Sequence, residues 1–135
     1  MRITLSENEI VPLVLTKLSD KGITHIKLRD NNSVEVGVRK KIAFFDLSVQ
    51  VYLIVFARDG KPAFTVDRIE GLPWGFGSAA KLIMSFFNFF PEDILVDGGV
   101  YLVSINNFIK NSNIRLSING IGVSSGRISA DFSVV

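Results

Sequence analysis

Apolar and polar positions follow a helical spacing near the start of the chain. Ser6 and Glu9 have the spacing of a capping box, in which each side chain bonds the other residue's backbone N–H. The pattern predicts a helix over residues about 7–20, which ends before Gly22 and is kinked or delayed by Pro12. Its predicted apolar residues are Ile10, Val11, Leu13, Val14, Leu15 and Leu18.

Apolar and polar residues alternate between residues 23 and 70, which is typical of strands with one buried face. The longest such segment, Ile42–Ala57, has one wholly apolar face, and its other face becomes apolar from Tyr52 onward. This indicates a long, curved antiparallel sheet. The turns predicted along the chain are Asp30–Ser33, Arg58–Lys61, Asn119-Gly120 and Ser125-Gly126.

A Phe-rich segment over residues 77–90 predicts the second helix, ended by Pro91, after which alternation resumes. Its polar residues form one narrow stripe, whereas an ordinary surface helix has an apolar arc of somewhat more than about 100°. The stripe consists of Ser78, Lys81, Ser85 and Asn88. Together these patterns predict a single α+β domain over residues 1–135, in which a long, strongly curved antiparallel sheet is wrapped around two helices.

Three interpretations account for the excess apolar surface of the Phe-rich segment. The wrapped sheet can bury the helix on most sides, so that the rings are simply core. Alternatively, the helix lines a groove for acyl chains or another apolar ligand, with Met84 and the phenylalanines as adaptable walls. The third interpretation is a homodimer or membrane-surface face, with Trp74 at the interface.

Composition narrows the class of protein. The 135 residues are 47% hydrophobic with a net charge of +2 and no cysteine, which excludes a disordered chain, a disulfide scaffold and thiol catalysis. The sequence pI is about 9.0, but basic and acidic residues are interleaved, so we expect no nucleic-acid binding. The single basic run is Arg39-Lys40-Lys41, which is either a solvated strand end or a contact for anionic headgroups.

Residues that could carry catalysis are scarce. His25 is the only histidine, and its alternation with Lys27 predicts a surface position. No serine lies in a nucleophile-elbow context, and no constellation of metal ligands is visible. We therefore expect a protein that is not an enzyme and needs no cofactor or metal.

The order of motifs resembles that of a known family. A Leu-Ser-x-x-Glu-Ile helix start is followed by an Ile-Lys-Leu strand, a Val-Glu-Val strand, a long apolar strand and an Asp-Gly hairpin. Next come Ile69-Glu70-Gly71-Leu72-Pro73, the Phe-rich helix, and strands around a Gly turn between Ile118 and Ile128. This order resembles the phospholipid-binding proteins of the LmeA type, relatives of the tubular lipid-binding (TULIP-like) superfamily. The resemblance implies a curved sheet wrapped around helices and an apolar groove that holds lipid.

The expected function is non-enzymatic binding of a lipid or another apolar small molecule between the Phe-rich helix and the sheet. The expected ligand-binding residues are Leu72, Trp74, Phe76, Ile83, Met84, Phe86, Phe87 and Phe90. The expected headgroup or membrane contacts are Arg39, Lys40 and Lys41. The alternative is a structural or interaction module without a ligand, such as a homodimer. No secretory signal is visible, so we expect a cytoplasmic or membrane-peripheral location unless a leader has been removed.

Overall fold

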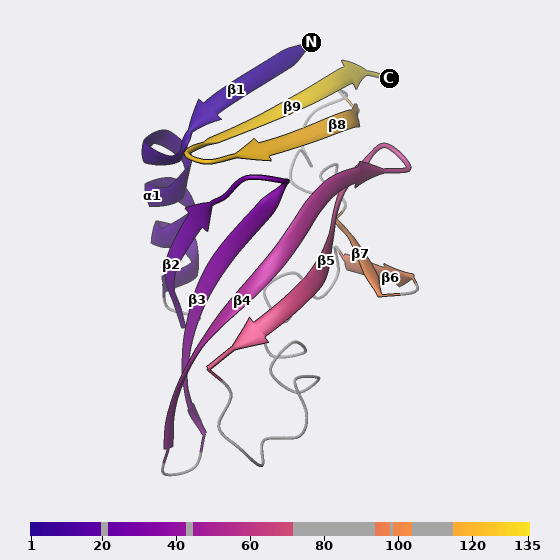
Figure 1. Ribbon diagram of the computed structural model, residues 1–135. Coiled ribbons are helices and arrows are strands. Elements are labelled where there is room, and N and C mark those ends of the chain that lie inside the picture. Colours follow the sequence, from indigo (N-terminus) through magenta and orange to yellow (C-terminus); the bar gives the residue numbers. More distant parts are fainter. Residues whose placement is uncertain (20–21, 43–44, 72–93, 98, 104–114) are drawn as a thin grey trace.

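Most of the described chain lies in β-strands. The computed structural model describes residues 1–19, 22–42, 45–71, 94–97, 99–103 and 115–135 (Figure 1). Within these ranges are nine strands and one helix. The strands form a six-stranded and a three-stranded sheet, and every pair of neighbouring strands is antiparallel.

The six-stranded sheet is built around two long strands. Its strand order is β2-β3-β4-β5-β7-β6. β3 and β4 pair from Ser33↔Ile54 to Ile42↔Phe45, and the Asp59-Gly60 hairpin joins β4 to β5 with positive φ at both residues. The bounds are β2 Ile23–Leu28, β3 Ser33–Ile42, β4 Phe45–Arg58, β5 Lys61–Glu70, β6 Ile94–Asp97 and β7 Val100–Val103.

The three-stranded sheet joins the two ends of the chain. Its order is β1-β9-β8, and the Met1 ammonium group donates a 2.9 Å hydrogen bond to the carbonyl of Phe132. β1 is Arg2–Ser6, β8 is Leu116–Ser124 and β9 is Arg127–Val134. The alternation expected at the chain's end is present, but Asn119-Gly120 is not a turn. It lies inside β8, where the register with β9 shifts between Ile118 and Gly120.

The predicted N-terminal helix is present as α1, Glu7–Leu18. Its capping box is formed, since the Ser6 side chain faces the N3 backbone and the Ser6 N–H donates to the Glu9 carboxylate at 3.0 Å. Pro12 lies inside the helix. α1 lies beside β2 and contacts β1, so it covers one edge of the six-stranded sheet (Figure 1).

The core lies on the apolar face of the six-stranded sheet. Cross-strand pairs such as Val36↔Val51 and Val38↔Val49 place branched side chains opposite one another, as the alternation predicted. Val123 of β8 belongs to the same cluster, and so the three-stranded sheet packs against this core. The buried cluster is Ile23, Leu28, Val34, Val36, Val38, Leu47, Val49, Val51, Leu53 and Val123.

The expected fold class is wrong. Strands hold 72% of the described residues, in two antiparallel sheets with one short helix, so the sheet is not wrapped around two helices. The helix predicted at residues 7–20 forms over twelve residues, and the other regular elements of the described chain are strands. The second expected helix, residues 77–90, lies outside the described residues. The arrangement implied by the TULIP-like resemblance is therefore not the observed one, and the lipid-binding expectation has no support from the fold.

Candidate polar ligand site

Polar side chains line up across four strands on the other face of the six-stranded sheet, here called the polar face. Lys27 is opposite Glu35, Glu35 is opposite Tyr52, and Tyr52 is opposite Arg68. The neighbouring row consists of His25, Gly37, Gln50 and Glu70. Because cross-strand partners have Cβ atoms about 4.5–5.5 Å apart, these side chains are within reach of one another.

Glu35 is the centre of this network. It is 8% exposed, and its two carboxylate oxygens have separate partners. Oε1 accepts a 2.9 Å hydrogen bond from the Arg29 guanidinium, and Oε2 lies 3.0 Å from His25 Nε2. Desolvation by itself would raise the pKa of Glu35, but hydrogen bonds from His25 and Tyr52 and the charge of Arg29 outweigh it and lower that pKa. The carboxylate is thus held in its charged form.

His25 reaches Glu35 because of two local features. The register between β2 and β3 shifts between Ile23 and His25, and such a bulge re-aims a side chain. Across the strand, Gly37 leaves room for the imidazole: a Cβ at this position would overlap His25 Nδ1 and lie 2.6 Å from Thr24 Oγ1. The ring therefore lies directly over the backbone of β3. The surface position expected for His25 holds only in part, since its side chain is 43% exposed but paired.

Tyr52 is a buried aromatic ring between two arginines. It is 6% exposed, with Arg68 Cζ 4.0 Å and Arg29 Cζ 5.9 Å from its ring centroid. The hydroxyl lies 3.0 Å from Gln50 Oε1 and 3.2 Å from Glu70 Oε2 and, having one proton, donates to one of them at a time. Desolvation and the neighbouring carboxylates of Glu35 and Glu70 raise the pKa of Tyr52, so the phenol stays neutral.

Arg68 is fixed by the residues on either side of it in β5. Its Nε donates to Glu70 at 3.1 Å, and its Nη1 donates to Asp67 at 3.4 Å. Asp67 lies where the register between β4 and β5 shifts, so that Tyr52 faces Arg68 while Leu53 faces Val66. Stacking on Tyr52 and two acidic neighbours therefore hold the guanidinium over the polar face.

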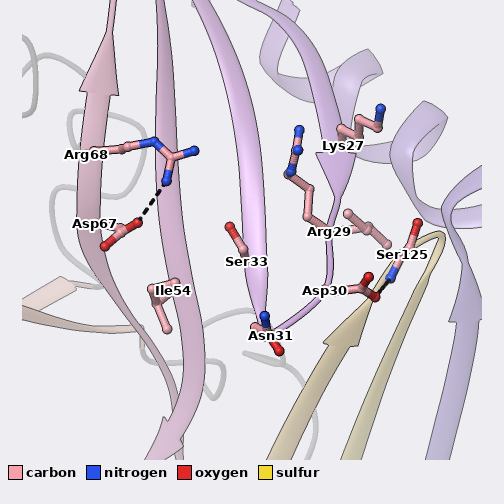
Figure 2. Close-up of a pocket in the computed structure, with 10 residues that line it drawn as sticks. Lys27, Arg29, Asp30, Asn31, Ser33, Ile54, Asp67, Arg68 and Ser125 are labelled. Atoms are coloured by element: carbon pink, nitrogen blue, oxygen red, sulfur yellow. Dashed lines mark hydrogen bonds and ion pairs between the residues drawn. The ribbon is translucent and has the colours of Figure 1, made fainter.

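A pocket of about 480 Å³ opens beside this network. Figure 2 shows Arg68 on one side, Arg29, Asp30 and Ser125 on the other, and Ser33 between them. The lining residues are Lys27, Leu28, Arg29, Asp30, Asn31, Ser33, Ile54, Asp67, Arg68 and Ser125. The lining combines three cations and two carboxylates with hydroxyl and amide groups, and we call it the polar pocket.

The rim of the polar pocket is held by bonds between the two sheets. Asp30 Oδ1 accepts a 2.9 Å hydrogen bond from the N–H of Ser125, in the turn between β8 and β9. Asn32 does more, because its Nδ2 donates to the Ile121 carbonyl at 3.0 Å and its Oδ1 accepts from the Val123 N–H at 2.9 Å. Asn31 and Asn32 both have positive φ, which suits the predicted turn at residues 30–33.

The residues expected to bind a ligand all fall outside the part of the chain that the structure describes. Residues 72–93 lie outside the described part of the chain, so nothing tests the expected site at Leu72, Trp74, Phe76, Ile83, Met84, Phe86, Phe87 and Phe90. The basic run lies in β3 at the end away from the three-stranded sheet (Figure 1). There the exposed Arg39 Nη2 lies 3.7 Å from Asp46 Oδ2, and Lys41 is exposed.

The alternation within each strand does not predict the polar pocket, because the residues that line it come from several different strands. Lys27, Arg29 and Glu35 occupy the polar positions of alternating segments, which by itself predicts only the polar face of a strand. The sequence does contain a usable indication: the polar positions of four consecutive predicted strands include basic residues, acidic residues and one tyrosine. Pairing those strands as consecutive hairpins would have brought Glu35 opposite Tyr52.

Comparison with known proteins adds no further assignment. No protein-family model, curated protein or solved structure matches the chain. Among the described residues, no group of three or more His, Asp or Glu side chains is placed to hold a metal ion. Within the same residues, no helix has the length and apolar character needed to cross a membrane.

Proposed function

We propose that the protein binds a small, hydroxylated organic anion in the polar pocket. The observation that carries this proposal is the convergence of Lys27, Arg29 and Arg68 on one pocket of about 480 Å³. This volume is within the range of about 300–1,000 Å³ that is usual for small-molecule sites. This pocket does not suit an apolar ligand, because Leu28 and Ile54 are the only large apolar side chains among its described lining residues.

Each cation keeps donors that its protein partners do not use. Arg29 bonds Glu35 through one terminal nitrogen, and Arg68 uses Nε and one terminal nitrogen on Glu70 and Asp67. A guanidinium has five N–H donors, so both arginines can also bind a ligand carboxylate. Lys27 forms no ion pair with any residue that the structure describes, and its ammonium has three donors.

The remaining lining groups favour hydroxyls on the ligand. The Asp30 and Asp67 carboxylates accept hydrogen bonds, and Ser33, Ser125 and Asn31 can donate or accept them. A simple inorganic anion would satisfy the cations but would also face the two carboxylates. An anion that carries hydroxyl groups, such as a sugar acid or a hydroxycarboxylate, complements both.

The proposed role is binding without a chemical step, because the only histidine has a structural task. His25 Nε2 is bonded to Glu35, and its Nδ1 side lies against the Gly37 backbone. His25 is also not among the described residues that line the polar pocket, so it is not placed to exchange a proton with a ligand there. The buried Glu35 likewise has both oxygens occupied by protein groups.

The proposal is tested by calorimetric titration with glucuronate, gluconate and citrate, and with glucose as the uncharged counterpart of glucuronate. At least one anion is expected to bind, and glucose is expected to bind at least about tenfold more weakly than glucuronate, because it lacks the charge that the cations recognise. Lys27→Gln combined with Arg68→Gln is expected to weaken anion binding by about tenfold or more.

The matched control is Lys41→Gln, which removes the same kind of exposed positive charge at the far end of β3. This variant is expected to bind as the unchanged protein does. Circular dichroism shows whether each variant is folded, and Lys27→Gln alone suffices if Arg68→Gln disturbs Tyr52. Equal binding by all variants, or no binding of any anion in the panel, contradicts the proposal.

A further inference from the structure

The three-stranded sheet carries a second polar hollow, separate from the polar pocket. Its volume is about 310 Å³, and none of its lining residues lines the polar pocket. Thr4 of β1 is opposite Ser129 of β9, which is opposite Gly122 of β8, and Arg127 is flanked by Ser6 and Ser124 in the next row. The lining consists of Arg2, Thr4, Asn32, Gly122, Val123, Ser124, Arg127 and Ser129. We call it the arginine hollow.

The hollow exists because β8 carries a glycine where a side chain would fill it. A Cβ built at Gly122 would lie 3.1 Å from Ser129 Oγ, which is closer than most real Cβ contacts. Gly120, the next residue of β8 on the same face, also has no side chain. The Ser129 hydroxyl is thus left accessible between strands whose neighbouring residues are small or hydroxylated.

The charges around the hollow are not balanced. Arg127 is exposed and forms no ion pair with the part of the chain that the structure describes. Arg2 is only weakly paired, since its Nε lies 3.9 Å from Asp131 Oδ1 and both side chains are more than half exposed. None of the lining residues that the structure describes is acidic, in contrast to the polar pocket.

One wall of the hollow is rigid before any ligand arrives. Asn32 donates its side-chain amide to Ile121 and accepts from the Val123 N–H, and its backbone N–H donates to the Val123 carbonyl at 3.0 Å. At another point, Arg2 Nη2 donates to Ser129 Oγ at 3.4 Å, which turns this guanidinium toward the centre of the sheet face. Preorganised donors lose little entropy on binding.

We infer that the arginine hollow binds a tetrahedral oxyanion, the phosphate group of a soluble molecule. The two guanidiniums supply charge and paired N–H donors, and the hydroxyls of Thr4 and Ser124 supply further donors, whereas the Ser129 hydroxyl already donates to the Gly122 carbonyl at 3.5 Å. A tetrahedral anion has enough acceptor oxygens to use both sets. This inference does not depend on the proposed function, because it concerns another sheet, another set of residues and another ligand chemistry.

The test is a titration of the whole protein with inorganic phosphate, in which binding is monitored by the amide chemical shifts in ¹H–¹⁵N spectra. The amides of Gly122, Ser124 and Ser129 are expected to shift with one saturable dissociation constant. Arg127→Gln is expected to weaken binding by about tenfold, the effect usual for losing one charged hydrogen bond. Arg115→Gln, which removes another exposed arginine outside the hollow, is the matched control and is expected to change nothing.

A second variant separates a shaped site from loose attraction by positive charge. Gly122→Ala keeps every charge but crowds Ser129, so it is expected to weaken phosphate binding by severalfold or more. If Gly122→Ala does not fold, the exposed Arg127→Gln variant alone decides the question. Unchanged binding in the folded variants overturns the inference.

Two other results also contradict the inference. Shifts confined to Lys27, Arg29 and Arg68 would assign phosphate to the polar pocket instead. Sedimentation with vesicles of phosphatidylcholine and phosphatidic acid, without any response to inorganic phosphate, would assign the hollow to a membrane surface rather than to a soluble ligand.

Discussion

Glu35 shows how one buried carboxylate organises the polar face. It lies near the start of β3, where neighbouring residues on the opposite face form the core, and both its oxygens are bonded. An unpaired charge at this position would be costly, so Arg29 and His25 must be held near it. The residue therefore determines the placement of a cation in the pocket as well as local stability.

Replacing Glu35 with Gln is expected to lower stability and to change its dependence on pH. The folded protein lowers the pKa of Glu35 below its ordinary value of 4.5, so near that pH the folded state binds fewer protons than the unfolded state. The stabilisation is therefore present above pH 4.5 and is lost as the pH falls through the lower, folded pKa. Glu35→Gln should reduce the free energy of unfolding at pH 7 by about 1–3 kcal/mol, measured by urea denaturation.

The same measurements repeated between neutral and acidic pH check the linkage. The stability of Glu35→Gln should fall less steeply below pH 4.5 than that of the unchanged protein. Asp46→Asn is the control, because Asp46 is exposed and pairs with Arg39 only at 3.7 Å. Identical pH slopes for the Glu35 variant and the unchanged protein would exclude the described pairing.

Gly37 lies opposite His25 and leaves room for the imidazole ring. Gly37→Ala is expected to displace the His25 imidazole and to lower stability by about 1–3 kcal/mol, since a Cβ has no room there. In a His25→Ala background the same substitution should cost clearly less, because the imidazole is gone and only Thr24 Oγ1 remains close. Urea denaturation of the four proteins forms a double-mutant cycle, and additive effects would contradict the steric explanation.

At the scale of elements, the turn between β2 and β3 joins the two sheets. Asn31 and Asn32 have nearly equal positive φ, 62° and 59°, but only the Asn32 side chain bonds β8. The Asn32 carbonyl also accepts a 2.9 Å bond from the N–H of Val55. Asn31 thus contributes to the conformation of the turn, whereas Asn32 contributes to it and also bonds the two sheets together.

The two asparagines form a matched pair for mutation. Glycine tolerates positive φ at either position, so Asn31→Gly should leave stability nearly unchanged. Asn32→Gly keeps the turn but removes both side-chain bonds to β8, and it should lower the free energy of unfolding by about 1–3 kcal/mol. Equal effects of the two substitutions in denaturant titrations would mean that the bonds between the sheets do not stabilise the fold.

Local signals in the sequence were reliable where local geometry decides the structure. The capping box at Ser6 and Glu9 and the Asp59-Gly60 hairpin were both predicted and both form. Asn119-Gly120 has an equally strong turn signal, but pairing with β9 continues through it, and a register shift absorbs the extra residue. Long-range strand pairing overrides a dipeptide preference there.

The polar pocket and β1 show what the sequence could not reveal by itself. Each wall of the pocket comes from a different hairpin, so its charges converge only after β2, β3, β4 and β5 have paired. β1 alternates polar and apolar residues over only five positions, too few to predict a strand without its pairing to β9. Periodicity identified most of the strands but not which ones would be neighbours.

At the scale of the whole molecule, the two sheets differ in how firmly they are held. The buried cluster lies almost wholly in the six-stranded sheet, and Val123 is its only member from the three-stranded sheet. The three-stranded sheet also packs the partly buried Ile121 and Ile128 against this cluster, and hydrogen bonds such as those of Asp30 and Asn32 attach it at its turn. Elements with few buried apolar contacts open at lower free energy than the core.

Native-state hydrogen exchange is expected to show this difference. Amides of β1, β8 and β9 should exchange together, and at least about tenfold faster than those of β3 and β4, because fewer of their residues belong to the buried cluster. Asn32→Gly should speed exchange in β8 and β9 and leave β3 and β4 largely unchanged. Equal protection throughout both sheets would show that the molecule opens only as one unit.

The pairing of β1 with β9 constrains when the protein can fold during its synthesis. Met1 and Phe132 are bonded although 131 positions separate them in the chain. β1 leaves the ribosome before the other strands but cannot pair until β9 has emerged, whereas β2 to β5 can pair successively as they appear. The arginine hollow, which needs β1, β8 and β9, can therefore form only after the polar pocket's four strands are available.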